Sequence, residues 1–257
     1  MELNKIYNKS SENMSELNSD SVDLIVTSPP YNIDIQYGNK WKGGKAIESK
    51  GDKYSDNLSD ENYKHLLNNT FQECFRVLKN DGSFYLNMKS KYENGNLTPP
   101  FWVLDLLEGF NLKNIIIWNF DWGGSTNKRF ASRYEFVLFL TKDNKKWTFN
   151  LDDVKIPSLN YRPDRYKSQL KNPTDVWKIP LVSGNSKERT AHPAQFPEKL
   201  IERIVKASTN SGGIVLDPFI GSGTTAVVSK RLGRKYVGYD TNTDYIKIAN
   251  ERLSDEN

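Results

Sequence analysis

The first segment suited to chemistry is Ser28-Pro29-Pro30-Tyr31, at the end of the apolar run at 22–27. Two consecutive prolines fix φ and remove two N–H donors, whereas their carbonyl groups remain acceptors. The Ser28 hydroxyl and the Pro29 carbonyl can therefore accept hydrogen bonds from an amino group, while the Tyr31 ring stacks on the planar group that carries it. A rigid turn at a strand end would explain the two prolines but not the whole segment. The segment predicts a site for a planar amine.

The second segment is Asp217-Pro218-Phe219-Ile220-Gly221-Ser222-Gly223-Thr224, which also follows a strand-like run. Its Gly-x-Gly turn lets the backbone approach a ligand closely, and the helix expected after it favours a carboxylate or phosphate at its N-terminus. Asp240 lies 19 residues after Gly221, at the end of the next strand-like run. An acid in that position can bind ribose hydroxyls. No Gly-Lys-Ser or Gly-Lys-Thr follows, so the segment is not a P-loop.

Strands and helices must hold these two segments. Strand-like runs occupy 22–27, 82–88, 114–120, 135–142, 213–219 and 235–240, and helical apolar patterns occupy 62–79, 197–210, 224–232 and 243–253. Several of the strand-like runs are continuously apolar, as in strands covered on both faces. Their alternation with helices predicts an α/β fold with a doubly wound, mostly parallel sheet. Both chemical segments then lie at carboxyl ends of strands, where ligands bind in such sheets.

Two segments are basic although the net charge is only +4. Residues 36–54 hold five Lys against two acids, and residues 143–189 hold ten Lys and Arg against six acids, with aromatic residues interleaved. The second segment contains four prolines and lacks periodicity, which predicts a small loop-rich insert. Basic loops are often ordinary solvated surface, but this combination also fits a nucleic-acid binder. Lys40, Lys42 and Lys45 could grip phosphates from a flap or belong to a solvated loop.

The composition excludes several classes of protein. With 257 residues and 37% apolar residues, the chain can bury a core. A single cysteine, Cys74, on the apolar stripe of a helix, excludes an intramolecular disulfide framework and is expected in the core. Only His65 and His192 are present, so we expect no metal site. The apolar runs are too short for a membrane span, and the N-terminus lacks a secretory signal, which predicts a cytoplasmic protein without membrane contact.

The two segments and their order resemble the DNA amino-methyltransferases that use S-adenosylmethionine. SPPY at 28–31 resembles the catalytic loop of that family, and FIGSG at 219–223 resembles its cofactor loop. HPAQFP at 192–197 and NPTDVWKIP at 172–180 are similar to segments that precede the cofactor strand. The catalytic loop comes first, as in the permuted beta class. Methyltransferases that act on protein glutamine carry a similar Asn-Pro-Pro-Tyr segment, but their cofactor loop comes first. The order of the two loops therefore argues against a protein substrate.

The resemblance implies a permuted Rossmann-like methyltransferase fold in three parts. Residues 1–142 would form the catalytic half of the core, 143–190 a target-recognition insert, and 191–257 the cofactor-binding half. The residues implied to hold the target base are Ser28, Pro29, Pro30 and Tyr31. Those implied to bind S-adenosylmethionine are Ser10, His192, Pro193, Asp217, Phe219, Gly221, Gly223, Thr224 and Asp240. Ser10 stands where the family often has an acid.

The implied substrate is double-stranded DNA with the target base flipped out of the helix. The enzyme would align an exocyclic amine with the activated methyl group, and acceptors on both N–H groups would free the lone pair of that nitrogen. Ser28 favours N4 of cytosine, because relatives acting on adenine more often carry Asp there. HPAQFP at 192–197 also resembles cytosine-type members, but adenine N6 remains open. A partner restriction endonuclease and a homodimer also remain open.

Two other classes compete with this interpretation: an RNA or small-molecule methyltransferase, and a non-catalytic DNA-binding relative. The basic insert argues against the first, and the intact SPPY and FIGSG against the second. Glu73, Glu108 and Glu135 show no spacing typical of a catalytic pair. Because Ser28 precedes Phe219 by 191 positions, we expect changes in the catalytic loop to leave cofactor affinity largely unchanged.

Overall fold

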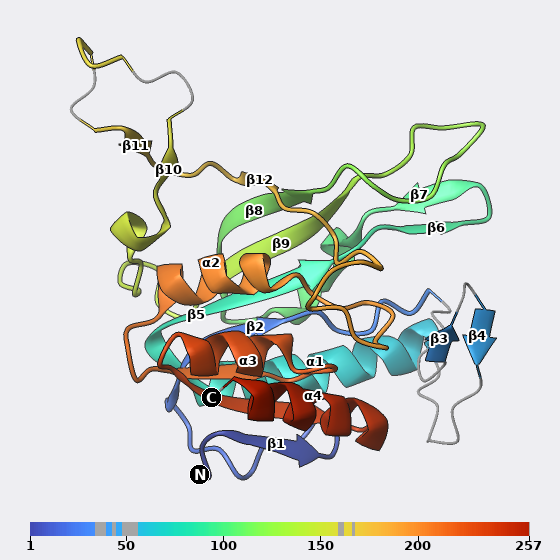
Figure 1. The fold of residues 1–257 in the computed structure, drawn as a ribbon. Coiled ribbons are helices and arrows are strands. Elements are labelled where there is room, and N and C mark those ends of the chain that lie inside the picture. Colours follow the sequence, from blue (N-terminus) through green and yellow to red (C-terminus); the bar gives the residue numbers. More distant parts are fainter. Residues whose placement is uncertain (34–39, 43–44, 48–55, 159–161, 166–167, 257) are drawn as a thin grey trace.

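The computed structural model describes residues 1–33, 40–42, 45–47, 56–158, 162–165 and 168–256. Its centre is an eight-stranded sheet in the order β1-β14-β13-β2-β5-β9-β8-β12 (Figure 1). Within this sheet, β9 runs antiparallel to both of its neighbours and the other pairings are parallel. The strands are β1 Lys5–Asn8, β2 Val22–Thr27, β5 Leu78–Met88, β8 Asn111–Asn119, β9 Tyr134–Thr141, β12 Val176–Lys178, β13 Ile214–Asp217 and β14 Lys235–Asp240. The predicted α/β fold with a mostly parallel sheet is confirmed.

Helices cover both faces of the sheet because successive strand residues point to opposite sides. Ile25 of β2 packs in one apolar cluster with α1 (Asp60–Val77). Leu24 and Val26 pack in another cluster with α2 (Glu198–Ser208) and with Val228 of α3 (Thr224–Arg231). A last helix, α4 (Thr243–Asp255), packs on α3 and β14. Cys74 is fully buried in the first cluster, as expected, and burial raises the pKa of its thiol.

The end of α1 differs from the sequence-based prediction. The helix begins after Ser59, whose side chain accepts a hydrogen bond from the backbone N–H of Asn62, and it ends at Val77. The Lys-Asn-Asp-Gly sequence at 79–82 is typical of a helix end, but these residues lie inside β5. The sheet register between β2 and β5 shifts here, and a Cβ at Gly82 would lie 2.6 Å from Leu78 Cδ1 and 3.0 Å from the Asp23 carbonyl oxygen. Gly82 is therefore required for a close strand approach rather than for ending the helix.

Shorter elements connect the sheet and helices. They are the 3₁₀ helices η1 (Pro100–Leu106) and η2 (Leu151–Val154) and the strand pairs β3 (Lys40–Lys42) with β4 (Lys45–Ile47), β6 (Lys91–Glu93) with β7 (Asn96–Thr98), and β10 (Ile156–Pro157) with β11 (Leu170–Lys171). Much of the basic segment 36–54, and the side chains of Lys40, Lys42 and Lys45, lie outside the described residues.

The segment 143–190 divides between two places. Asp143 and Thr148 donate backbone hydrogen bonds to the carbonyl oxygens of Asn80 and Asp81, at the amino end of β5. The strands β10 and β11 project from this end of the sheet, opposite to β3, β4, β6 and β7 (Figure 1). The chain then returns as β12, whose pairing with β8 makes it an edge strand of the main sheet. Trp177 in β12 is buried in the second apolar cluster. Part of the predicted insert is therefore part of the sheet.

Among the helices of the described residues, none has both the length and the apolar character needed to cross a lipid bilayer.

Candidate active site at two neighbouring strand ends

The two chemical segments lie side by side because β2 and β13 are neighbours in the sheet. Leu24 pairs with Val215 and Ile25 with Leu216, so the two loops leave the same edge. Thr27 Oγ1 donates a hydrogen bond of 2.6 Å to Asp217 Oδ1, which joins the last residue of β2 to the last of β13. This hydrogen bond joins the two loops across 190 positions of sequence. That changes in the catalytic loop leave cofactor affinity largely unchanged stays a prediction.

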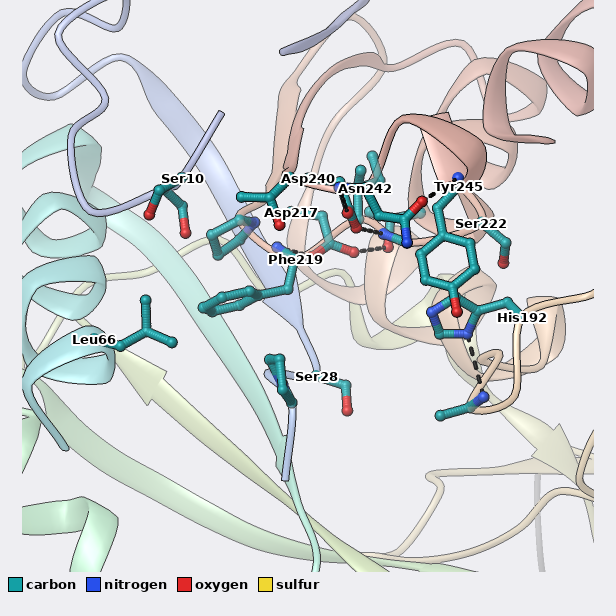
Figure 2. A pocket seen from close by; sticks show the side chains of 18 of the residues that line it. Ser10, Ser28, Leu66, His192, Asp217, Phe219, Ser222, Asp240, Asn242 and Tyr245 are labelled. Carbon is teal, nitrogen blue, oxygen red and sulfur yellow. Dashed lines mark hydrogen bonds between the residues drawn. The ribbon is translucent and has the colours of Figure 1, made fainter. Parts of the chain in front are cut away.

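A cavity of about 550 Å³ opens at this edge (Figure 2). Its size is in the range of small-molecule sites. Phe219 lies between Ser28 and Asp240 in this view. Nine of the predicted site residues line the cavity: Ser10, Ser28, Pro30, His192, Asp217, Phe219, Gly221, Thr224 and Asp240. Pro29, Tyr31, Pro193 and Gly223 are not among its lining residues. Unpredicted lining residues include Glu12, Leu66, Phe196, Asn242 and Tyr245.

Asp217 holds both loops in place. It is buried, with Oδ1 accepting from Thr27 Oγ1 and from the Phe219 N–H, and Oδ2 accepting from Thr225 Oγ1 at 2.6 Å. Burial raises the pKa of its carboxyl to about 6, although these hydrogen bonds oppose the shift. The carboxyl thus links the catalytic loop to the cofactor loop and to the first turn of α3.

Asp240 is the second acid in the cavity. Its Oδ2 accepts from the Gly221 N–H at 2.9 Å, and its Oδ1 accepts from the Asn242 N–H at 2.7 Å. Burial raises its pKa to about 6, with the backbone hydrogen bonds acting in the opposite direction. An ionised carboxylate offers about four lone-pair sites, more than its backbone donors occupy. Asp240 lines the cavity, so its remaining lone pairs could accept hydrogen bonds from the hydroxyl groups of a bound ribose.

The glycines of the cofactor loop have two different roles. Gly221 lines the cavity at φ +49°, and a Cβ there would lie 2.8 Å from His192 Nε2. Gly223 has φ +81°, and its Cβ would lie 2.6 Å from the Ala249 Cβ, so it allows α3 and α4 to pack closely. The resemblance places both glycines against the cofactor, but Gly223 faces α4.

His192 closes one side of the cavity as a neutral ring. It packs on the Tyr245 ring at a centroid distance of 4.4 Å, and its Nδ1 accepts from the Ala194 N–H. Burial, with the charges of Arg189 and Arg252, lowers its pKa to about 4. His192 therefore carries no charge at neutral pH and serves as a packing surface.

A Gly221→Ala substitution should weaken S-adenosylmethionine binding about tenfold or more, because a left-handed φ strains an L-residue by about 1–2 kcal/mol and the added methyl group displaces His192. Titration calorimetry with the cofactor measures the change. Gly184→Ala is the matched control, since nothing lies within 4 Å of a Cβ there. Unchanged affinity in the Gly221 variant would show that the loop shifts without affecting the site.

An acid also reaches the cavity from the N-terminal segment. Ser10 Oγ donates to Glu12 Oε2 at 3.0 Å, and both residues line the cavity. Glu12 is also held by Asn69, whose side-chain amide donates to Oε1 at 3.2 Å. The resemblance places the family's acid at position 10, so sequence reasoning misses a carboxylate two residues later.

A partly buried hydrogen-bond network supports the catalytic loop. Ser28 Oγ donates to the Tyr31 hydroxyl at 2.7 Å, and Tyr31 donates to Glu135 Oε2 at 2.9 Å. The Asn87 side-chain amide donates to the Tyr31 hydroxyl and, at 2.7 Å, to Glu135 Oε2. Lys89 Nζ lies 3.7 Å from Glu135 Oε1. We call Ser28, Tyr31, Asn87 and Glu135 the Tyr31 network.

Sequence reasoning sets Glu135 aside and misses Asn87. Glu135 lies 104 positions from Tyr31, in the strand β9, and Asn87 lies in β5. These two strands pair directly, with Asn87 opposite Val137. The sequence signal is that Glu135 and Asn87 are polar residues near the ends of otherwise apolar strands. This signal indicates a shared site only when the order of the strands in the sheet is known.

No group of three or more His, Cys, Asp or Glu side chains in the described parts of the chain could hold a metal ion.

Comparison with known proteins agrees with this geometry. Residues 22–251 match the model of a family described as DNA methylase. The chain is 37% identical over 243 residues to the type II methyltransferase M.HpaI of Haemophilus parainfluenzae, covering 95% of this chain and 71% of that protein. It is 36% identical over 252 residues to the DNA adenine methyltransferase YhdJ of Escherichia coli (strain K12), covering 93% and 79%.

Solved structures show the same fold. The PvuII DNA methyltransferase, described as cytosine-N4-specific, superposes with a TM-score of 0.71 at 21% identity, covering 97% of this chain and 86% of that one. The M1.HpyAVI complex with its cofactor SAM (S-adenosylmethionine) has a TM-score of 0.62 at 26% identity, covering 97% and 98%. The chain therefore belongs to the N6/N4 DNA methylase family and is an S-adenosylmethionine-dependent DNA methyltransferase.

Proposed function

We propose that this enzyme methylates the exocyclic N4 of cytosine in double-stranded DNA, with the target base flipped out of the helix. The observation that supports this most directly is the position of Ser28. It lines the same cavity as Phe219 and Asp240, which we call the cofactor cavity, and it also belongs to the Tyr31 network. An amino group held by Ser28 would therefore lie next to the bound cofactor. Base flipping follows because an amine inside the DNA duplex cannot reach a cavity at the carboxyl ends of β2 and β13.

The neutral side chain of Ser28 supports cytosine as the target, as does the resemblance of residues 192–197 to cytosine-type relatives. Adenine N6 is the second candidate, since the relative YhdJ is named a DNA adenine methyltransferase. A partner endonuclease and a homodimer remain predictions from the resemblance, as do the domain boundaries.

The hydrogen-bond directions around Ser28 fit the recognition of an amino group. The Ser28 hydroxyl donates a hydrogen bond to the Tyr31 oxygen. The lone pairs of Ser28 Oγ therefore remain free to accept a hydrogen bond from the target amine, and the Pro29 carbonyl is a second acceptor. Bound S-adenosylmethionine supplies an activated methyl group. When Ser28 and the Pro29 carbonyl accept hydrogen bonds from both N–H groups of the amine, its nitrogen is less conjugated with the ring. The lone pair of the nitrogen is then free to attack the methyl group.

The Tyr31 network also gives a path for the proton that the amine loses. That proton passes to Ser28 Oγ as the Ser28 hydroxyl proton passes to the Tyr31 oxygen and the Tyr31 proton passes to Glu135 Oε2. The last two transfers follow hydrogen bonds of 2.7 and 2.9 Å that join Ser28 to Tyr31 and Tyr31 to Glu135. Tyr31 is thus a link in the path as well as a candidate surface for base stacking.

Nucleoside analysis of methylated DNA tests the proposal. Plasmid DNA treated with purified enzyme and labelled S-adenosylmethionine is digested to nucleosides, and mass spectrometry should find N4-methyldeoxycytidine. N6-methyldeoxyadenosine alone would contradict the cytosine assignment and leave the enzyme class intact. RNA treated in parallel should stay unmethylated. A reaction without enzyme provides the blank.

A further inference from the structure

A second cavity lies on the other side of the catalytic loop. Its volume is about 550 Å³, and it opens between the β6–β7 hairpin and the loop 120–133 that joins β8 to β9. We call it the hairpin groove. The hairpin and the loop extend from the same end of the sheet (Figure 1). Residues lining the groove include Asn32, Lys89, Tyr92, Arg129, Arg133 and Tyr134.

The catalytic loop separates the hairpin groove from the cofactor cavity. Ser28 and Pro30 line the cofactor cavity, whereas Asn32 and Ile33 line the groove. Lys89, at the inner end of the groove, is the residue whose Nζ lies 3.7 Å from Glu135. A nucleotide whose base reaches Ser28 would therefore have its sugar and phosphates near this groove.

The walls of the groove are basic. Residues 89–98 and 120–133 together contain five basic residues, Lys89, Lys91, Lys128, Arg129 and Arg133, against two acids, Glu93 and Asp121. Both acids have cationic partners: Glu93 lies 3.1 Å from Lys91 Nζ, and Asp121 lies 2.9 Å from Lys178 Nζ. The excess positive charge suits a phosphodiester backbone.

Aromatic side chains stand exposed beside these cations. Phe130 is 100% exposed and Trp122 is 76% exposed, both in the loop 120–133. Arg129, next to Phe130, lies over the Tyr92 ring at 4.1 Å from its centroid and so joins the loop to the hairpin. Arg133 donates to the carbonyl oxygens of Gly123 and Gly124, which shapes the loop. Exposed rings among cations are typical of surfaces that stack bases or insert between them.

The other basic segment, 143–171, is less well placed for the target nucleotide. Its hydrogen bonds with Asn80 and Asp81 lie at the amino end of β5, and Leu86, beside Thr27, is five residues further along that strand. At about 3.3 Å per residue, this places Asp143 and Thr148, where the segment joins the sheet, roughly 17 Å from the catalytic loop. The groove adjoins that loop directly.

We propose that the hairpin groove binds the DNA strand that carries the target base, with Phe130 inserted among the bases next to the flipped nucleotide. Arg129 and Lys91 bind the phosphates on either side of the flipped nucleotide. This inference rests on DNA being the substrate, and it is independent of whether cytosine or adenine is methylated.

Equilibrium binding to a fluorescein-labelled 40-base-pair duplex, followed by anisotropy over a range of salt concentrations, tests the groove without requiring turnover. Lys91→Ala/Arg129→Ala should lower DNA affinity at least tenfold and reduce the slope of log K against log salt by about two, one for each phosphate that is no longer neutralised. Phe130→Ser should lower affinity several-fold with an unchanged slope, and Phe130→Trp should restore it.

The comparison variant replaces two exposed cations of the predicted target-recognition insert, Arg162→Ala/Lys171→Ala, and should lose less DNA affinity than Lys91→Ala/Arg129→Ala does. If the comparison variant loses affinity and the groove variants do not, DNA binds at the 143–171 segment and the proposal is wrong. If Phe130→Ser changes the sedimentation mass but not DNA affinity, the loop forms an interface between two copies of the chain, which also overturns the proposal. If the unmodified enzyme binds the duplex through the groove but methylates only adenine, the groove stands and the proposed cytosine specificity fails.

Discussion

A Glu135→Gln variant should transfer methyl groups about 100-fold more slowly in a single turnover, while its affinity for S-adenosylmethionine stays near that of the unmodified enzyme. The reason is the Tyr31 network, in which Glu135 accepts the Tyr31 hydroxyl proton and Tyr31 accepts that of Ser28. The amide keeps the shape of the carboxylate but removes the charge that draws protons along this path. Proton acceptors of this kind typically contribute about 10²- to 10⁴-fold to a rate.

A Tyr31→Phe variant distinguishes a loss of rate caused by a broken proton path from one caused by a disturbed fold. The ring remains available for stacking in that variant, but the connection between Ser28 and Glu135 is broken. If the network acts as a unit, the double variant Tyr31→Phe/Glu135→Gln should be no slower than Tyr31→Phe. Glu202→Gln, an exposed carboxylate paired with Lys206, is the control. Near-normal transfer by Glu135→Gln would contradict the path, as would a decrease in rate that only parallels a fall in melting temperature.

An Asp240→Ala variant should bind S-adenosylmethionine about 10- to 150-fold more weakly, which corresponds to roughly 1.5–3 kcal/mol for hydrogen bonds to a charged acceptor. The carboxylate would no longer be there to accept from the ribose hydroxyls. Titration calorimetry measures the affinity, and melting temperature shows whether removing the hydrogen bonds to Gly221 and Asn242 has disturbed the loop. Unchanged affinity in a folded variant would contradict the ribose assignment.

The pH dependence of cofactor binding gives an independent test of Asp240. Its pKa is raised to about 6, so the carboxylate is ionised at pH 7 and mostly protonated at pH 5. Because a protonated carboxyl is the poorer acceptor, affinity should fall as the pH drops from 7 to 5, by up to about tenfold at one unit below the pKa. His192, with a pKa lowered to about 4, stays neutral over most of this range. Asp240→Asn should bind weakly with little pH dependence, and a fall that persists in this variant would assign it to Asp217 or to the cofactor.

The strands and the chemical segments could be predicted from local sequence. The run at 235–240 coincides with β14, and the helices α1 to α4 lie within the predicted stretches apart from a few end residues. Apolar periodicity reports which residues face a core, and Pro-Pro and Gly-x-Gly restrict the backbone locally. These signals need no knowledge of distant segments. Of the nine predicted site residues that line the cavity, seven were named from these local segments, and the family resemblance supplied Ser10 and His192.

Some elements escaped prediction because their signals were weak. The edge strand β1 has four residues and β12 has three, too few for a period to be visible. Residues 79–82 are typical of a helix end because Asn, Asp and Gly favour turns, but the register shift against β2 and the space that Gly82 provides place them in a strand.

Two loops, their order and the class of chemistry were therefore determined by the sequence alone, because each depends on residues adjacent in the chain. The tertiary structure decided which distant residues join them. The pairing of β2 with β13 brings Thr27 to Asp217 across 190 positions, and the pairing of β5 with β9 brings Glu135 to Tyr31 across 104. Strand order is set by the packing of both sheet faces at once, which no local pattern records. The same packing places the hairpin groove beside the catalytic loop, and Asp143 and Thr148 of the other basic segment at the amino end of β5.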